Sequence, residues 1–260
     1  MYPVLLQFGP ITIYSIWIFL IFGLFATLIS ITKLVKSRSV KLNFLAENSL
    51  LIFFSALVFS RIIFVARNFL YFWDAAVTNH SYFDIFYIWD KGLSIWGAII
   101  GVFIALFILS RRENENFGAW SDILIPSIII GMIFGNIGAF LDGRNYGTPT
   151  NLPWGVTMEA SRYAVPIHPT QIYASIYCLI LAIVLFKLFN HNFFKITGRI
   201  SLFAIASFSF LRFLDEFMRG DETASFLFLR EPQYYCLIAF GISVYFLYKE
   251  FKSENKTEQT

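Results

Sequence analysis

The sequence has few charged residues and few cysteines. Lys, Arg, Asp and Glu make up 14% of the 260 residues, whereas a soluble domain carries about 25%. So little polar surface excludes a water-soluble globular protein, because lipid must replace water around most of the chain. The two cysteines, Cys178 and Cys236, lie inside apolar runs. They are interpreted as small buried hydrophobes, with no disulfide framework or zinc site implied.

Further absences narrow the function. The net charge is only +3 and no basic tract is present, so we expect no nucleic-acid partner. The chain has no cluster of Cys and His ligands and no nucleotide-type glycine loop, so the sequence predicts no metal and no cofactor. No internal repeat is evident, which weakens a transporter or channel interpretation built on duplicated halves.

The chain instead contains long apolar stretches. Hydrophobic residues make up 57% of it, and a bilayer core of about 30 Å needs about 20 helical residues. Each span must be a helix, because lipid cannot satisfy open backbone groups. The sequence therefore predicts an all-α polytopic membrane protein with about seven transmembrane helices, at 11–32, 45–66, 92–110, 120–141, 168–189, 198–218 and 232–249. The first run has no preceding Lys or Arg and no small-residue cleavage site, so we interpret it as a retained span and not a signal peptide.

The positive charges predict the orientation. Twelve of the twenty Lys and Arg residues follow spans one, three, five and seven, and six lie on the other side. The positive-inside rule assigns the richer side to the cytoplasm. The N-terminus is then outside, residues 1–249 form a single membrane domain, and 250–260 form a charged cytoplasmic tail. The outer loops 67–91, 142–167 and 219–231 are the long ones, and the aromatic-rich 67–91 suits the headgroup region, so we expect the site at the outer face.

Charged residues in the sixth span have an informative spacing. Ionisable groups at membrane depth cost about 2.5–3.5 kcal/mol each on insertion scales. Arg212, Glu216 and Arg219 stand at i, i+4 and i+7, which predicts one helix face and a net positive stripe rising toward the outer surface. The stripe is either a structural ion-pair ladder or a docking site for an anionic headgroup. Arginine suits a phosphate because its planar fork makes two parallel hydrogen bonds.

Two further blocks lie on the same outer side. The exit from the fourth span combines flexible Gly143 and Gly147 with polar residues, a density that favours a site over a plain helix end. These polar residues are Asn136, Asp142, Arg144, Asn145 and Tyr146. The block His168-Pro-Thr-Gln-Ile-Tyr173 opens the fifth span, with the proline suited to a helix start. His168 is either a cap or packing group or a catalytic group, and we expect His168 and Gln171 to point toward Arg144.

Together these blocks resemble the bacterial prolipoprotein diacylglyceryl transferases. The matching runs are GAFLDGRNYGTPT at 138–150, HPTQIY at 168–173, LRFLDEFMR at 211–219, FGPITIYSIW at 8–17 and WDKGLSIWGAIIG at 89–101. The resemblance implies transfer of a diacylglyceryl group from phosphatidylglycerol to the lipobox cysteine thiol of a prolipoprotein, at the outer face of the bacterial plasma membrane. The implied partners are phosphatidylglycerol, other membrane lipids and the prolipoprotein signal peptide. A thiol must lose its proton to act as a nucleophile, and cations must hold the leaving phosphate.

The resemblance also assigns residues. From the resemblance, the expected substrate-binding residues are Arg61, Asp90, Ser94, Gly143, Gln171, Arg212, Glu216 and Arg219. Asn136 and Tyr146 are expected to join them because they belong to the polar exit from the fourth span. The chain departs from the family pattern at Trp96 (usually His), Asn136 (usually Arg), Ala139 (usually Asn), Arg144 (usually acidic), Ile16 (usually Tyr) and Ala174 (usually acidic).

These departures leave two interpretations open. In the first, Arg144 replaces the missing arginine, provided that the helix breaks near Asp142 and the chain folds back. The catalytic residues are then Asp142, Arg144 and His168, with Asp142 or His168 as the base. In the second, the chain is a non-catalytic member of the same fold that binds anionic lipid or a lipoprotein partner.

Overall fold

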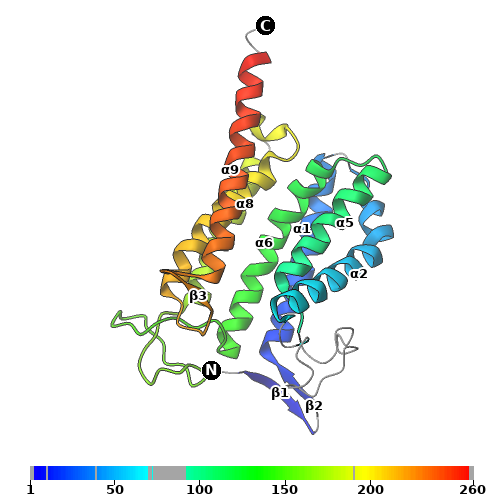
Figure 1. The fold of residues 1–260 in the computed structure, drawn as a ribbon. Helices are drawn as coiled ribbons and strands as arrows, with labels where there is room; N and C mark the ends of the chain where they lie inside the picture. The colour runs from blue at the N-terminus through cyan, green and yellow to red at the C-terminus, as the bar shows by residue number, and fades with distance from the viewer. Residues whose placement is uncertain are drawn as a thin grey trace. The chain divides into compact units, whose positions relative to one another are not determined.

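The structure is a computed structural model that describes residues 3–9, 11–38, 40–69, 72, 92–189 and 191–257. Its described part contains seven α-helices: α1 (Ser15–Arg38), α2 (Leu42–Arg67), α5 (Ile95–Arg112), α6 (Phe117–Asp142), α7 (Thr170–Leu188), α8 (Arg199–Asp215) and α9 (Glu231–Thr257) (Figure 1). Five of them, α1, α2, α5, α6 and α7, are long and apolar enough to cross a membrane. Of the others, α8 has 17 residues and α9 carries polar residues at both ends. The predicted all-α membrane architecture is confirmed.

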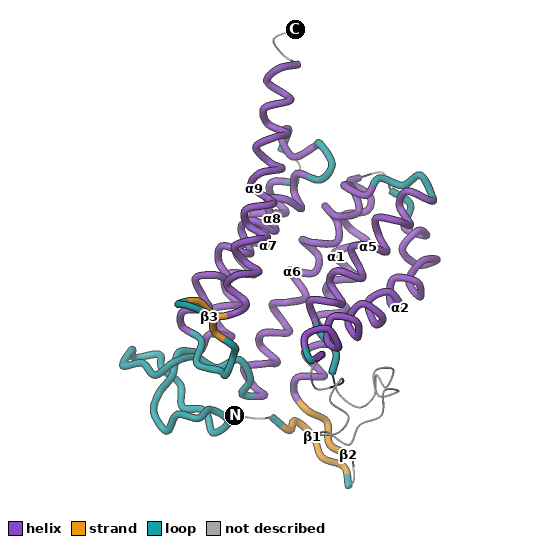
Figure 2. Tube along the Cα trace, viewed as in Figure 1, coloured by secondary structure: helices purple, strands orange, loops and turns teal. Residues whose placement is uncertain are grey.

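Two short antiparallel hairpins accompany the helices (Figure 2). Strands β1 (Val4–Phe8) and β2 (Ile11–Tyr14) form the first, and β3 (Ser225–Phe226) and β4 (Leu229–Arg230) form the second. The prediction that the first helix begins at residue 11 is therefore wrong. Thr12 and Ile13 are β-branched and favour a strand, and Gly9 ends β1 at a φ of 57°. The other six helices begin within three residues of their predicted starts.

By their contacts the residues divide into two compact units, one of residues 1–38 and 118–260 and one of residues 39–117. In the smaller unit, α2 packs against α5 through small polar side chains. Ser60 Oγ donates to the Ser94 carbonyl at 2.8 Å, and Ser55 Oγ donates to the Gly101 carbonyl at 2.9 Å. Small residues of this kind let the backbones of membrane helices approach closely.

In the larger unit, a buried carboxylate fixes one end of α8. Asp122 of α6 accepts hydrogen bonds from the backbone N–H groups of Gly198 and Ser201, both at 2.8 Å. It also pairs with Arg38 Nη2 at the end of α1, at 3.1 Å. The carboxylate thus satisfies N–H groups at the start of α8, where a negative charge is favourable. The opposite end of α8 carries the candidate site.

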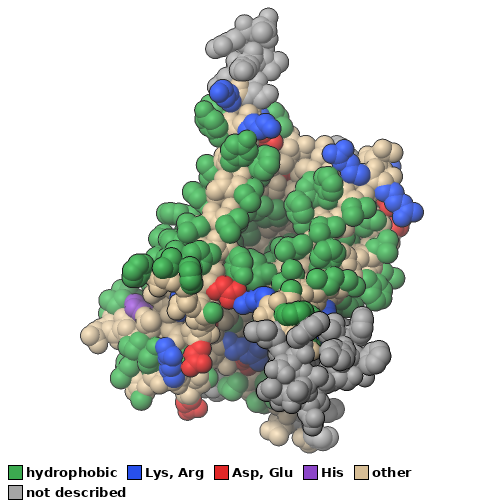
Figure 3. All heavy atoms as spheres, in the orientation of Figure 1, with side chains coloured by type: hydrophobic (Ala, Val, Ile, Leu, Met, Phe, Trp, Pro, Cys, Tyr) green, Lys and Arg blue, Asp and Glu red, His purple; other side chains and the backbone are tan. Residues whose placement is uncertain are grey.

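The sides of the helices expose large apolar residues. On α9, Ile238 is 59% exposed, Ile242 53% and Tyr245 61%, and Figure 3 shows hydrophobic side chains along the visible face of this helix. Exposed apolar surface on this scale is unusual for a soluble monomer. It is the surface expected of helices that lipid surrounds.

Candidate functional site

The site begins where α6 ends. Gly143 follows the last helical residue, Asp142, and adopts a φ of 76°, a left-handed conformation that glycine adopts without a steric cost. The Arg144 N–H then donates back to the Ala139 carbonyl at 3.0 Å, which closes the last helical turn. The helix therefore breaks near Asp142, which is one of the conditions for Arg144 to replace the missing arginine.

The segment after this break is held between two other parts of the chain. On one side, Thr148 N donates to the Met218 carbonyl at 2.8 Å and Gly220 N donates to the Tyr146 carbonyl at 2.9 Å. On the other side, Gly147 N donates to the His168 carbonyl at 3.1 Å. A β-carbon at position 147 would lie 2.3 Å from that carbonyl oxygen, so only glycine fits there. The three sequence blocks of the larger unit therefore meet at one place.

Charged residues at the end of α8 form what we call the arginine cluster: Arg212, Arg219 and Arg230 with Asp215, Glu216 and Asp221. Glu216 is its centre and is 1% exposed. Its Oε2 lies 2.6 Å from Arg212 Nη2 and 3.9 Å from Arg219 Nε, and its Oε1 lies 3.0 Å from Arg230 Nε. One buried carboxylate thus holds three guanidinium groups from two segments.

The expected continuous helical face is only partly present. The α-helix ends at Asp215, residues Glu216–Met218 form the 3₁₀ turn η3, and Arg219 is extended with a ψ of 136°. The prediction of a net positive stripe is also wrong, because Asp215 pairs with Arg212 at 2.7 Å and Asp221 pairs with Arg219 at 2.8 Å. Three arginines and three carboxylates balance in charge. The sequence spacing missed this because Asp221 and Arg230 lie beyond the helix.

The Arg219 guanidinium is hydrogen-bonded to the side chains of Asp221 and Asn145. Its Nε and Nη2 donate to the two oxygens of Asp221 at 2.9 and 2.8 Å, and Nη2 also donates to Asn145 Oδ1 at 2.8 Å. Burial alone would raise the pKa of Asp221, but the hydrogen bonds from Arg219 and the charges of Arg219 and Arg230 hold it below its ordinary value of 3.8. Burial alone would lower the pKa of Arg219, and Asp221 raises it above its ordinary value. Both groups are therefore charged near neutral pH.

The three expected catalytic residues do not form one group. The Arg144 guanidinium pairs with Asp142, and its side chain is 69% exposed. Gln171 does point toward Arg144, because its Nε2 donates to the Arg144 carbonyl at 2.5 Å. The imidazole of His168 instead contacts the hydroxyl of Tyr173, with Nδ1 and Oη 3.2 Å apart.

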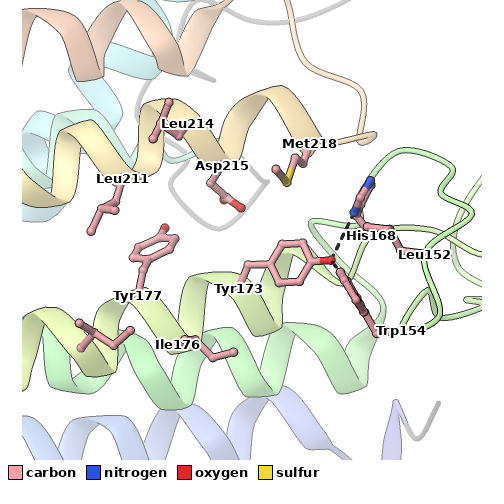
Figure 4. Close-up of a pocket in the computed structure, with 11 residues that line it drawn as sticks. Leu152, Trp154, His168, Tyr173, Ile176, Tyr177, Leu211, Leu214, Asp215 and Met218 are labelled. Carbon is pink, nitrogen blue, oxygen red and sulfur yellow. Dashed lines mark hydrogen bonds between the residues drawn. The ribbon is translucent and has the colours of Figure 1, made fainter.

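His168 lies at a cavity of about 470 Å³ between α7 and α8 (Figure 4). Tyr173 also accepts a hydrogen bond from Trp154 Nε1 at 2.7 Å, so its hydroxyl joins the imidazole to an indole. Tyr177 and Asp215 line the cavity further along, among Leu and Ile side chains. Asp215 Oδ1 is buried and accepts no hydrogen bond from any residue that the structure describes. The cavity suits an apolar chain with a polar group at one end.

The remaining predicted site residues lie elsewhere. Arg61 and Ser94 belong to the smaller unit, where Arg61 Nη1 donates to the Gly92 carbonyl at 3.0 Å and the guanidinium lies 5.5 Å from the ring of Phe64. Ser94 caps α5 by accepting from Gly97 N at 3.5 Å. Asn136 is a partly exposed residue of α6.

Two predictions fall outside the described residues. They are the assignment of Asp90 and most of the aromatic loop 67–91, in which only 67–69 and Phe72 are described. Among the positions that the structure does describe, no three His, Cys, Asp or Glu side chains lie so that they could hold a metal ion.

Two residues of the arginine cluster, Asp221 and Arg230, were not selected from the sequence, and Asn145 was named there but not as a partner of Arg219. Arg230 Nη1 donates to the Arg219 carbonyl at 2.5 Å, and Nη2 donates to the Asp221 carbonyl at 2.8 Å. A signal was present, since Arg219 and Arg230 bracket a short loop that also carries Asp221. Charge pairs within a loop have no fixed period, so helical spacing could not find them.

The sequence matches a known protein family over nearly its whole length. A family model described as prolipoprotein diacylglyceryl transferase matches residues 3–249. The chain is 30% identical to a phosphatidylglycerol–prolipoprotein diacylglyceryl transferase of Streptomyces griseus, over 93% of this chain and 74% of that protein. It is 27% identical to proteins of the same name from Clostridium tetani, over 94% and 96% of the two chains, and from Methylococcus capsulatus, over 92% of each.

Proposed function

Because the chain belongs to the prolipoprotein diacylglyceryl transferase family, we propose that it transfers the diacylglyceryl group of phosphatidylglycerol to the cysteine thiol of a prolipoprotein. The observation that carries the proposal is the convergence of Arg212, Arg219 and Arg230 on one buried carboxylate, Glu216. Cations gathered at one place are what a reaction with a phosphate leaving group requires, because they stabilise the negative charge that develops on the leaving oxygen.

The step is a substitution at carbon. The cysteine thiol gives its proton to a base, since the thiolate is the nucleophile. The sulfur then bonds to the glyceryl carbon that carries the phosphate, and the bond from that carbon to the phosphate oxygen breaks. The electron pair leaves with the oxygen as glycerol phosphate. The proton of the thiol passes to the leaving phosphate or to water, so atoms and electrons balance.

The residues divide between these tasks. Arg219 and Arg230 hold the phosphate, and Asn145 orients Arg219 through its 2.8 Å contact with Nη2. Arg144 supplies a further cation from the loop after α6. Asp142 or His168 takes the thiol proton. His168 is supported by its place at the cavity and by the Tyr173 hydroxyl that orients its ring. Asp142, at the end of α6, is the less favoured of the two because its carboxylate is paired with Arg144.

The place of the reaction follows from the charge pattern. We propose that the arginine cluster faces the outside of a bacterial plasma membrane, where a lipid and a translocated precursor can meet. The twelve Lys and Arg residues on the opposite side of the predicted spans support this orientation. The peptide substrate is then the signal-peptide segment that carries the lipobox cysteine.

A second candidate is binding without transfer. One reason is that the charges of the arginine cluster already balance, and Asp221 occupies both donors of the Arg219 fork. The other is that Trp96 and Asn136 stand at positions where the family usually has His and Arg. A non-catalytic member would bind anionic lipid or a lipoprotein partner on the same surface.

One assay separates the two candidates. Purified protein is reconstituted in vesicles of phosphatidylglycerol, and a precursor peptide with a lipobox cysteine is added and followed by mass spectrometry. Transfer predicts a mass increase by one diacylglyceryl group, which disappears with a Cys→Ser peptide and with phosphatidylcholine vesicles. Peptide or lipid that binds without any mass change supports the second candidate and contradicts the first.

A further inference from the structure

The loop between α8 and α9 ends in an exposed apolar tip. Phe226 is 69% exposed, Leu227 76% and Phe228 96%. These three residues are consecutive, and they belong to a connecting hairpin and not to any of the helices. Single exposed apolar residues are common on proteins, but three large ones at the tip of one loop are not explained by chance exposure.

The conformation of the tip is also unfavourable for its residues. Phe226 pairs with Leu229, so Leu227 and Phe228 form a two-residue turn. Leu227 has a φ of 53°, a left-handed conformation in which the side chain crowds the backbone. Turns of this kind prefer Gly, Asn or Asp at such positions. Strain that persists in a loop points to a function for the residues that bear it.

The base of the hairpin is held firmly by the arginine cluster. Arg230, the last residue of β4, donates to the carbonyls of Arg219 and Asp221 and to Thr223 Oγ1 at 2.9 Å. Glu231 N donates to the Ala224 carbonyl at 2.8 Å. These hydrogen bonds connect the base of the hairpin to the segment that contains Arg219.

The tip lies against the start of α9. The Tyr234 hydroxyl donates to the Phe226 carbonyl at 2.6 Å, and the two rings lie 6.4 Å apart. Figures 1 and 2 show β3 beside the first turns of this helix. The apolar tip therefore lies beside the first turns of α9, and the charged residue Arg230 lies at its base.

We propose that Phe226, Leu227 and Phe228 insert into the lipid leaflet at this end of the helices and anchor the arginine cluster at the membrane surface. Lipid is the occupant that fits the observations, because the apolar tip and the charged base, with its paired arginines and carboxylates, are ordered as acyl chains and charged headgroups are ordered in a leaflet. The inserted tip fixes the height of Arg219 and Arg230 relative to lipid phosphates. The proposal does not depend on whether the protein catalyses transfer.

Spin labelling of the full chain in phosphatidylglycerol nanodiscs tests this directly. A nitroxide is attached to Phe228→Cys, with Leu227→Cys as a second position and Glu222→Cys as the matched control, since the Glu222 side chain is 86% exposed in the same loop. The native Cys178 and Cys236 are buried, and unmutated protein carried through the labelling gives their background. Collisions with oxygen, which concentrates in lipid, are compared with collisions with a water-soluble nickel complex.

The two tip labels are expected to collide more with oxygen than with nickel, and the Glu222 label to show the reverse. Tip labels that collide with nickel as readily as the Glu222 label would place the tip in water and overturn the proposal. Tip labels shielded from both reagents would also overturn it, because they would indicate a protein contact, either with a second copy of the chain or with another segment.

Discussion

The Arg219 guanidinium donates two parallel hydrogen bonds to the Asp221 carboxylate, Nε to Oδ1 at 2.9 Å and Nη2 to Oδ2 at 2.8 Å. This is the geometry with which arginine binds a phosphate. Asp221 therefore occupies the place that a lipid phosphate would take on Arg219. A phosphate that binds there must displace this carboxylate or share the guanidinium with it.

The change Asp221→Asn is expected to strengthen phosphatidylglycerol binding. A neutral amide competes less well than a carboxylate for a guanidinium, a difference of about 1 kcal/mol or about fivefold in affinity. The apparent KM for phosphatidylglycerol, measured by varying its mole fraction in vesicles, should fall by about that factor. An unchanged or higher KM would show that Asp221 does not compete with the lipid.

The same pair predicts a pH dependence of stability. The pKa of Asp221 is lower in the folded protein than its ordinary value of 3.8. The pairing therefore stabilises the fold fully above that pH, and the contribution is lost as the pH falls through the folded pKa, below 3.8. Wild type should exceed Asp221→Asn in unfolding free energy by a constant amount above about pH 5, and the difference should vanish in stronger acid. Thermal unfolding in detergent at several pH values measures it, and a difference that grows on acidification contradicts the assignment.

Glu216→Gln is expected to destabilise the protein strongly. The substitution removes the one buried charge that Arg212, Arg219 and Arg230 share, and breaking a buried ion pair from one side costs about 3–5 kcal/mol. The unfolding free energy in detergent should fall by that amount. Glu222→Gln is the matched control, because its side chain is 86% exposed and surface changes usually stay within about 0.5 kcal/mol. Equal stability of the two variants would mean that Glu216 does not organise the cluster.

Arg144→Ala tests whether this arginine substitutes for the one that the family usually has at position 136. Its side chain is 69% exposed, so folding should be unaffected. Transfer to a lipobox peptide should fall about 100-fold, the lower end of what lost electrostatic stabilisation costs, and Arg144→Lys should recover part of it. Transfer at the wild-type rate in Arg144→Ala would remove this residue from the mechanism.

Much of the fold was predictable from the sequence because lipid imposes simple rules. Apolar length identified each of the seven α-helices in the part of the chain that the structure describes, since a span must be helical and about 20 residues long. The error at residues 11–14 arose because this short segment joins directly to the apolar run of α1, and hydropathy alone does not distinguish a strand with β-branched residues such as Thr12 and Ile13 from a helix end.

The site was predictable only as far as it followed helical spacing. Arg212 and Glu216 were found at i and i+4, and they pair at 2.6 Å. Arg230 and Asp221 were not found, because their positions depend on how a loop folds back on η3. The exposed position of the Arg144 side chain and its pairing with Asp142 were not predicted either, because both follow from the left-handed turn at Gly143.

The account as a whole depends on Arg219 holding the lipid phosphate during transfer. The most direct test is the transfer rate of Arg219→Gln in phosphatidylglycerol vesicles, with Arg162→Gln as the control because that arginine lies on the surface beside Tyr163 and Glu222. We predict a fall of about 100-fold or more for Arg219→Gln, with Arg162→Gln close to wild type and both variants folded. Transfer by folded Arg219→Gln at the rate of the control would contradict the account.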